Sequence, residues 1–143
     1  MKARIVRRSL LVLLLFAICA NGALAQLGAK SDPLGAVAGK SVIFLVRSDP
    51  DAYQRKAEVH LDGGKPVAMY PGTYMRWVVA PGAHQIQATA PDTGLMKLRT
   101  EAGKVYFVRQ DVGGITAPMS TLQRMSERDG RAAVRRSTRA DSR

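Results

Sequence analysis

The chain is poor in the residues that most often carry catalytic or metal chemistry. Its 143 residues include one cysteine, Cys19, and two histidines, His60 and His84. A disulfide needs two cysteines, and a structural zinc site needs four nitrogen or sulfur ligands. The composition therefore excludes a disulfide within the chain and supplies too few ligands for a zinc site of this kind.

Catalytic motifs are lacking as well. The sequence has no Gly-x-Ser-x-Gly segment, and Gly113-Gly114 is not followed by the Gly-Lys-Ser/Thr of a phosphate-binding loop. Asp49 and Asp51 flank Pro50, an arrangement typical of a turn rather than of a carboxylate pair for hydrolysis. We therefore predict no catalytic residue and no cofactor, and keep a hydrolase of unrecognised type as an alternative.

One set of side chains has the chemistry of metal ligands. Glu58, His60 and Asp62 alternate along one predicted strand and so share a face. Neighbours on that face lie roughly 6–7 Å apart, because a strand rises ~3.3 Å per residue, and they would hold one metal ion only loosely. We interpret them as a solvated polar face and predict no metal site.

The first 25 residues have the order of a secretory signal peptide. Four basic residues come first, an apolar run follows over residues 10–20, and the small-x-small pattern Ala23-Leu24-Ala25 comes last. Cleavage after Ala25 gives an exported chain, periplasmic or secreted, that begins at Gln26. The apolar run is shorter than the ~20 residues of a membrane-spanning helix, so we predict no membrane span in the mature chain. An uncleaved membrane anchor is the alternative.

Cys19 raises a further alternative, which is lipid attachment. A bacterial lipoprotein signal places a small residue before its cysteine, whereas Ile18 precedes Cys19 and Phe16 lies three residues before it. We therefore predict that Cys19 is removed with the signal peptide.

Positive charge is in excess. There are 22 basic and 11 acidic residues, a formal net charge of +11, and removal of residues 1–25 leaves 18 basic residues against the same 11 acids. From Arg124 to the end there are seven arginines and three acids, with no aromatic residue. Such a charge favours solubility and weak attraction to anionic surfaces. Nucleic-acid grooves interleave aromatics with basic residues, so we predict no nucleic-acid binding.

Seven short segments have the composition and alternation of β-strands, with Gly- and Pro-containing turns between them. They are residues 41–47, 57–61, 65–69, 73–80, 84–90, 96–100 and 105–112. Their spacing predicts an all-β fold, a small antiparallel β-sandwich. The continuous apolar run in the first segment is typical of a strand buried on both faces, and Pro66 marks the third as an edge strand.

Alternation assigns individual side chains to faces. Met75, Trp77 and Val79 share one face of their strand, which places Trp77 in the core. We interpret His84, which follows Pro81-Gly82, as a side chain that hydrogen-bonds across the turn and fixes its shape.

The segments outside the strands complete the predicted organisation. Residues 26–40 are a flexible lead-in, and residues 41–136 form the β-sandwich domain. Ser126 with the acids after it predicts a short helix from about Glu127 to Arg136. Residues 137–143 are expected to be a disordered basic tail, whose deletion leaves the melting temperature nearly unchanged.

Several motifs together resemble a known family. They are Val59-His60-Leu61-Asp62-Gly63, Gly72-Thr73-Tyr74, Pro81-Gly82-Ala83-His84, the stretch from Glu101 to Gln110, and Gly130-Arg131-Ala132. The chain from about Ser41 to Arg136 resembles the bacterial exported family catalogued as domain of unknown function 2846. The resemblance implies an immunoglobulin-like or carboxypeptidase-regulatory-like sandwich and brings no activity, cofactor or catalytic residue.

These observations predict a non-catalytic module of the cell envelope. Its partner would be an envelope protein or an anionic envelope polymer. The alternative function is weak binding of anionic envelope material, lipid or lipopolysaccharide, through basic residues. The candidate contacts are Arg47, Arg76 and Arg109, provided that their strands are neighbours and they share a face, together with Arg135, Arg136 and Arg139.

Overall fold

The computed structural model describes residues 32–47, 54–89, 93–113 and 119–142. The chain divides into two compact units, Met1–Pro33 and Leu34–Arg143, and every described helix and strand belongs to the second. The predicted signal peptide and its cleavage site lie outside the described residues.

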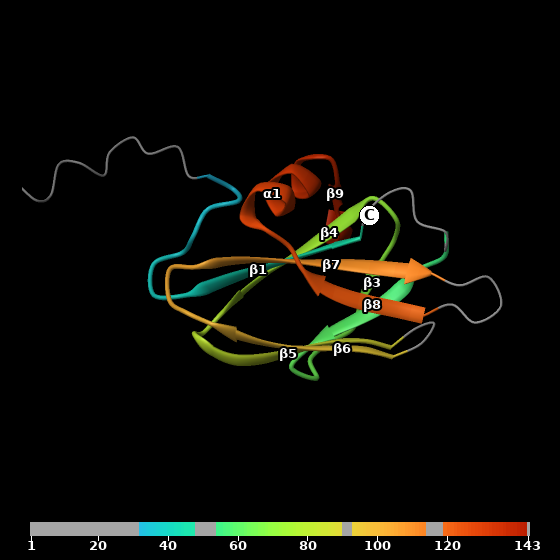
Figure 1. Cartoon of the computed structure of the whole chain (residues 1–143), viewed down its shortest axis with the longest axis horizontal. Coiled ribbons are helices and arrows are strands. Elements are labelled where there is room, and N and C mark those ends of the chain that lie inside the picture. The colour runs from blue at the N-terminus through green and yellow to red at the C-terminus, as the bar shows by residue number, and fades with distance from the viewer. Residues whose placement is uncertain (1–31, 48–53, 90–92, 114–118, 143) are drawn as a thin grey trace, which may run out of the picture. The chain divides into compact units, whose positions relative to one another are not determined.

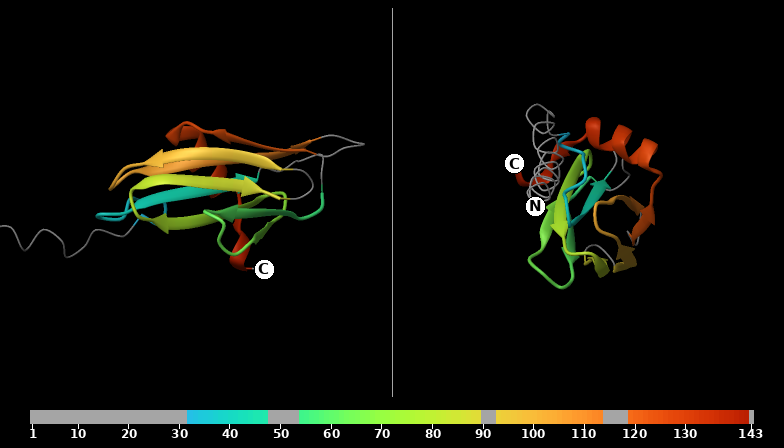
Figure 2. Two further views of the ribbon diagram at one scale, coloured as in Figure 1. Left: turned by 90° about the horizontal axis from the view of Figure 1, so that it is seen from below. Right: turned by 90° about the vertical axis from the view of Figure 1, so that its left-hand side faces the viewer.

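The second unit is a two-sheet β-sandwich with a short helix on one face (Figure 1). Its elements are β1 Ser41–Arg47, β2 Ala57–Leu61, β3 Val67–Met69, β4 Thr73–Val79, β5 Gly82–Ala88, β6 Gly94–Thr100, β7 Val105–Gly113, β8 Met119–Arg124, α1 Glu127–Arg135, β9 Thr138–Arg139 and the 3-10 turn η1 Ala140–Ser142. One sheet has the order β8-β7-β1-β4-β9 and the other β3-β2-β5-β6. Figure 2 shows the two sheets facing each other from two further directions. The predicted all-β sandwich with a C-terminal helix is confirmed.

The pairing differs from the prediction in three details. Strands β8 and β9 were not predicted, and the pairs β1–β7 and β4–β9 are parallel rather than antiparallel. The turn at residues 101–104 closes no antiparallel hairpin, because it leads from β6 in one sheet to β7 in the other. Parallel pairing joins strands that are distant in sequence, and local turn signals carry no information about it.

Strand β1 is the centre of the fold because it is buried on both faces, as its continuous apolar run predicts. Ile43 and Leu45 point into the core between the sheets, whereas Val42, Phe44 and Val46 pack on the opposite side. The rings of Phe44 and Phe107 stack there with centroids 5.2 Å apart. This second cluster also includes Leu34, so the predicted flexible lead-in is packed at that residue.

Helix α1 covers the outer face of the five-stranded sheet. Ser126 is its N-cap, and the Ser126 hydroxyl accepts a hydrogen bond from the backbone N–H of Asp129 at 3.1 Å, as the sequence predicts. Gly130 lies directly against the ring of Phe107, and a Cβ at this position would overlap the Cβ and Cγ atoms of Phe107. Glycine, a poor helix former, is therefore required for close packing of the helix on β7.

The predicted disordered tail over residues 137–143 is ordered from residue 137 to residue 142, and Arg143 lies outside the described residues. Thr138 and Arg139 form β9, which pairs with Thr73 and Tyr74 at the start of β4. Ala140 then packs against the core between the sheets. Charge and lack of aromatics suggested a solvated tail, but two backbone pairs and one small apolar side chain are enough to hold it. Deletion of this segment is therefore expected to lower the melting temperature, not to leave it unchanged.

Gly130→Ala tests the packing of α1. Alanine in a helix interior is favoured over glycine by about 1 kcal/mol, but overpacking typically costs about 1–3 kcal/mol, so we expect a net loss of stability. The free energy of unfolding from urea titration measures it. Gly113→Ala is the matched control, because a Cβ at Gly113 has no neighbour within 4 Å among the described residues. A stabilised Gly130→Ala variant would contradict this packing.

Candidate functional site

An apolar cleft opens between the edges of the two sheets. It has a volume of about 830 Å³ and lies between β3 at the edge of one sheet and β4 near the edge of the other. Its apolar lining comes from Leu61, Pro66, Val67, Tyr70, Met75 and Trp77, with Ala140 and Asp141 of the C-terminal segment at one side. We call this the β3–β4 cleft.

The cleft follows from the unequal lengths of its two walls. Strand β3 has three residues and β4 has seven, so β3 covers only part of the inner face of β4. Pro66, directly before β3, has no N–H to donate to a ladder, which ends the strand there. Side chains on the inner face of β4 are consequently left without a complete opposing strand.

Trp77 is the largest of these side chains. Alternation placed it on the inner face of β4 with Met75 and Val79, and the structure confirms this, since all three pack against the core between the sheets. Trp77 is nevertheless only half-buried, because it also lines the β3–β4 cleft. Among the described residues its indole N–H has no hydrogen-bond acceptor. Trp77 therefore offers an apolar ring and a donor to the cleft.

The opposite side of the sandwich is closed. There β6 and β8 approach so closely that a Cβ at Gly94 would overlap the backbone carbonyl oxygen of Ser120. Glycine permits this approach of two backbones. The two sheets therefore separate at the β3–β4 side and meet at the β6–β8 side.

Arg47 holds the wall of the cleft in place rather than facing a partner. Its side chain is 0% exposed, and its Nη1 donates to the carbonyl oxygens of Met69 at 2.8 Å and Arg55 at 2.7 Å. Met69 belongs to β3, so this bond joins the two sheets. The prediction of Arg47 as an anionic-partner contact is wrong, because the guanidinium is enclosed and already bonded to backbone carbonyls.

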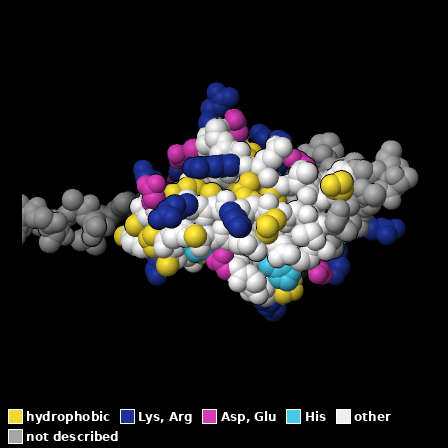
Figure 3. Space-filling view, turned by 60° about the horizontal axis from the view of Figure 1, so that its bottom comes forward, with side chains coloured by type: hydrophobic (Ala, Val, Ile, Leu, Met, Phe, Trp, Pro, Cys, Tyr) yellow, Lys and Arg dark blue, Asp and Glu magenta, His cyan; other side chains and the backbone are white. Residues whose placement is uncertain are grey.

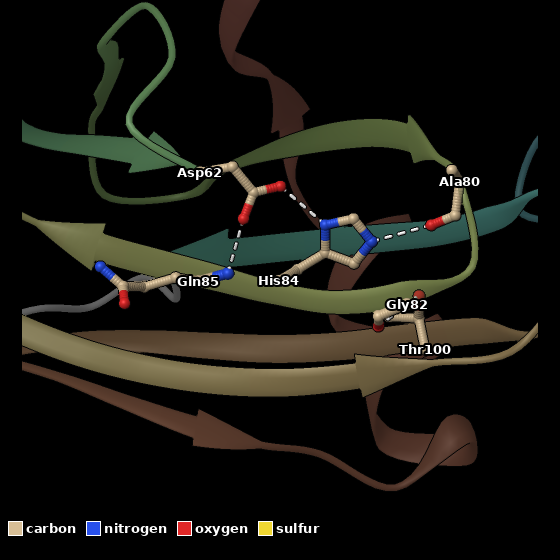
Figure 4. Close-up of polar contacts among 6 residues, drawn as sticks. All are labelled: Asp62, Ala80, Gly82, His84, Gln85 and Thr100. Carbon is tan, nitrogen blue, oxygen red and sulfur yellow. Dashed lines mark hydrogen bonds and ion pairs between the residues drawn. The ribbon is translucent and has the colours of Figure 1, made fainter.

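His84 links two turns at the other end of the four-stranded sheet (Figure 4). Its Nε2 donates to the carbonyl oxygen of Ala80 at 2.8 Å, and its Nδ1 lies 2.7 Å from Oδ2 of Asp62. The other carboxylate oxygen of Asp62 accepts from the backbone N–H of Gln85 at 2.7 Å. His84 therefore bonds across the turn as predicted, and its side chain is only 10% exposed.

This pair has perturbed acid–base behaviour without the geometry of a catalytic dyad. Burial works against the charged ring, but the hydrogen bonds to Asp62 and Ala80 together outweigh it and raise the pKa of His84. Burial also works against the Asp62 carboxylate, yet the hydrogen bonds from His84 and Gln85 prevail and lower the pKa of Asp62. A general base needs a free ring nitrogen, whereas both nitrogens of His84 are engaged.

The raised pKa of His84 predicts a pH-dependent stability. Protonated His84 contributes to the free energy of unfolding. This contribution is fully present below the unfolded-state pKa of about 6.5 and is lost as the pH rises through the higher folded-state pKa. The contribution of Asp62 is present above about 3.9 and is lost as the pH falls through its lowered folded-state pKa. We therefore expect His84→Gln to cost more stability at about pH 5.5 than at about pH 9, as measured by urea unfolding.

Asp62→Asn is the companion variant for this measurement. It removes the anion facing the ring, so it should also cost more at the lower of the two pH values. Equal losses at both pH values in either variant would contradict the raised pKa of His84.

The candidate metal ligands are each engaged with a protein group. Glu58 pairs with Lys56 at 2.9 Å, and His60 Nδ1 lies 2.9 Å from the carbonyl oxygen of Gly64. Asp62 faces His84. Within the described ranges, no group of three or more such residues is arranged to hold a metal ion.

Two of the remaining candidate arginines share one sheet face, and the others lie in the C-terminal helix and the segment after it. Arg76 and Arg109 share the outer face of the five-stranded sheet, because Arg76 pairs with Phe44, and Arg109 with Val46, of the same face of β1. Arg135 is exposed at the end of α1, and Arg139 pairs with Asp141 at 2.8 Å. The strands of Arg47, Arg76 and Arg109 are neighbours as the prediction required, but Arg47 faces the opposite side.

One shallow depression brings three arginines together. It has a volume of about 530 Å³ and is lined by Arg109, Arg124 and Arg136, with Gln123, Ser126 and Asp129 around them. Arg109 donates to Asp111 at 2.7 Å and to Gln123 at 3.0 Å. Arg124 lies over the ring of Tyr106, 5.1 Å from its centroid. Arg124 is not among the contacts predicted from the sequence, because the strand that presents it, β8, was not predicted.

Another mixed surface lies on the outer face of β6. Leu95, Lys97 and Arg99 alternate there and are exposed, Leu95 by 54%. Figure 3 shows Lys and Arg side chains standing among apolar ones on the side of the molecule where β5 and β6 lie. A depression of about 530 Å³ borders this surface, and it is lined by Lys97 and Arg99 of β6 together with Asp62, Ala83, His84 and Gln85.

Comparison with known proteins does not assign the chain to a family. No family model matches it. No curated protein matches it either. The resemblance to domain of unknown function 2846 therefore stays a prediction. Among the described residues, no helix has the length and apolar character needed to cross a membrane.

Proposed function

We propose that this chain is a non-catalytic interaction module whose β3–β4 cleft receives an apolar segment of a partner polypeptide. The single observation that carries the proposal is the apolar cleft itself, open at one side of a sandwich that is closed at the other. Apolar clefts with a few polar groups are the usual form of binding sites. Here the polar groups are the indole N–H of Trp77 and the polar lining residues Lys65 and Asp141.

The setting of this module is part of the same proposal. The signal-peptide pattern of residues 1–25 and the resemblance to an exported bacterial family support a location in the cell envelope, periplasmic or secreted. The partner would then be an envelope protein. The engagement of both nitrogens of His84 supports a non-catalytic role, because the one His–Asp pair of the described residues lacks a free base.

Photo-crosslinking tests the cleft directly. Tyr70 lines the β3–β4 cleft and is 37% exposed, so a photoreactive phenylalanine analogue in its place reaches a bound segment. We expect this variant, irradiated in envelope extract, to give a discrete crosslinked polypeptide identified by mass spectrometry. Val67→Glu, which places a charge in the cleft lining, should abolish the product.

The matched control carries the same photoreactive residue at Leu95. Leu95 is exposed on the outer face of β6 and does not line the cleft. A product of equal yield from both positions, or a Tyr70 product that survives Val67→Glu in a folded protein, would contradict binding in the cleft.

The second candidate function is weak binding of anionic lipid or lipopolysaccharide. The observation that favours it is the depression lined by Arg109, Arg124 and Arg136. Guanidinium groups suit phosphate oxygens because they donate in a fixed planar fork. Arg136 has no ion-pair partner among the described residues and is exposed.

Arg136→Gln tests this second function against a control of equal charge. We expect it to weaken binding to vesicles that contain anionic lipid, and the binding of the wild type to fall as salt screens the charges. Arg128→Gln removes the same charge from a position that is 94% exposed and does not line the depression, so it should leave binding nearly unchanged. Equal weakening by both variants in a co-sedimentation assay would show that net charge, not the depression, attracts the vesicles.

A further inference from the structure

The C-terminal segment, residues 138–142, adds a strand to the edge of β4. Strand β9 pairs with β4 in parallel, and the backbone N–H of Thr138 donates to the carbonyl oxygen of Gly72 at 2.9 Å. Directly after this strand, Ala140 packs against the core and lines the β3–β4 cleft with Asp141. Figure 1 shows β9 beside the start of β4. The segment Thr138–Ser142 thus combines an added strand with a small apolar side chain in the cleft.

Most of the β4 edge extends beyond this segment. Alternate residues of a strand direct their backbone N–H and C=O groups to the same edge. The carbonyl of Gly72 faces β9, so the backbone groups of Arg76 and Val78 face the same side. The β9 ladder reaches only Tyr74, and no other described strand pairs with this edge. The side chain of Val78 is 45% exposed beside it. An unpaired strand edge of this kind is a template for a further strand.

The hold on the C-terminal segment is small. Its ladder to β4 spans two residues, and the ion pair between Arg139 and Asp141 joins two half-exposed side chains of the segment itself, so it adds no bond to either sheet. Exposed ion pairs contribute little to stability. A longer strand that pairs along β4 from Thr73 to Val79, and that places a larger apolar side chain next to Trp77, would make more backbone and apolar contacts at the same place.

We propose that the edge of β4 and the β3–β4 cleft form an acceptor site for an extended segment of a partner polypeptide, and that Thr138–Ser142 is its resident occupant. The partner strand adds to β4 in the orientation of β9 and displaces the resident segment. This inference rests on the proposed function of the cleft and specifies the form of the ligand. Strand addition gives affinity through the main chain, and the cleft gives specificity through one apolar side chain.

The test releases the resident segment and supplies it again as a separate peptide. Ala140→Asp puts a charge into the apolar lining, and Thr138→Pro removes the N–H that donates to Gly72, so each variant detaches the segment by a different route. The probe is the synthetic peptide of residues 137–143, Ser-Thr-Arg-Ala-Asp-Ser-Arg. The readout is the fluorescence of Trp77, the only tryptophan of the chain, which lines the cleft.

We expect both variants to shift Trp77 emission to longer wavelength and the peptide to reverse the shift in Thr138→Pro. The apparent dissociation constant of the peptide should be about tenfold higher for the wild type, the factor expected if the resident segment fills the site for about nine tenths of the time. A peptide with leucine in place of alanine should bind more tightly, and one with aspartate there should not bind. Ala102→Asp, a control at an exposed turn, should behave as the wild type.

The outcomes separate this inference from the proposed function. Unchanged Trp77 emission in both folded variants, or a shift that no peptide reverses, would overturn the acceptor site. The crosslink at Tyr70 could still form in either case, and the cleft would then bind a partner without strand addition. Should Ala140→Asp fail to fold, Thr138→Pro alone decides, because it leaves the lining of the cleft unaltered.

Discussion

The rest of this structure depends on the hydrogen bonds of one buried group, the guanidinium of Arg47. A cation removed from water is costly unless its donors are bonded, and here backbone carbonyls of Met69 and Arg55 accept from it. The backbone carbonyl of the same residue accepts from the N–H of Gly72, directly before β4. One residue thereby fixes β3 in one sheet and the start of β4 in the other. The two walls of the β3–β4 cleft are held at a defined separation by this residue, without direct pairing between them.

The sandwich is asymmetric because its exposed strand edges are covered in different ways at its two sides. At β6 and β8 the backbones meet closely over Gly94. At β3 and β4 the mismatch in strand length leaves apolar side chains uncovered, and the chain covers part of them with its own last residues. Edges that are neither paired nor charged invite other strands. The cleft therefore lies where the short strand β3 of one sheet fails to cover the longer strand β4 of the other.

Sequence patterns predicted what depends on neighbouring residues and failed where distant residues decide. The run in β1 identified a strand buried on both faces, alternation placed Trp77 on the inner face, and Ser126 marked the start of α1. The same alternation could have found the inward Arg47, since it continues the face of Ile43 and Leu45. The two-residue strand β9 and the parallel β1–β7 pair have no local signature. The cleft depends on the position of the segment after β9 and on the opposition of β3 and β4, so no periodicity in the sequence could have located it.

The parallel pair of β1 and β7 has a consequence for how the chain folds. The first strand of the domain receives one of its two neighbours only when residues 105–113 are available, as the pairing of Val42 with Val105 requires. The chain between the two strands is long, and contacts between residues so far apart in sequence form slowly. Until then the face of β1 that carries Val42, Phe44 and Val46 lacks Phe107 and helix α1, which cover it in the folded domain, and exposed apolar segments of this kind associate with one another. A chain interrupted anywhere before β7 would consequently be a source of aggregates rather than of a smaller folded domain.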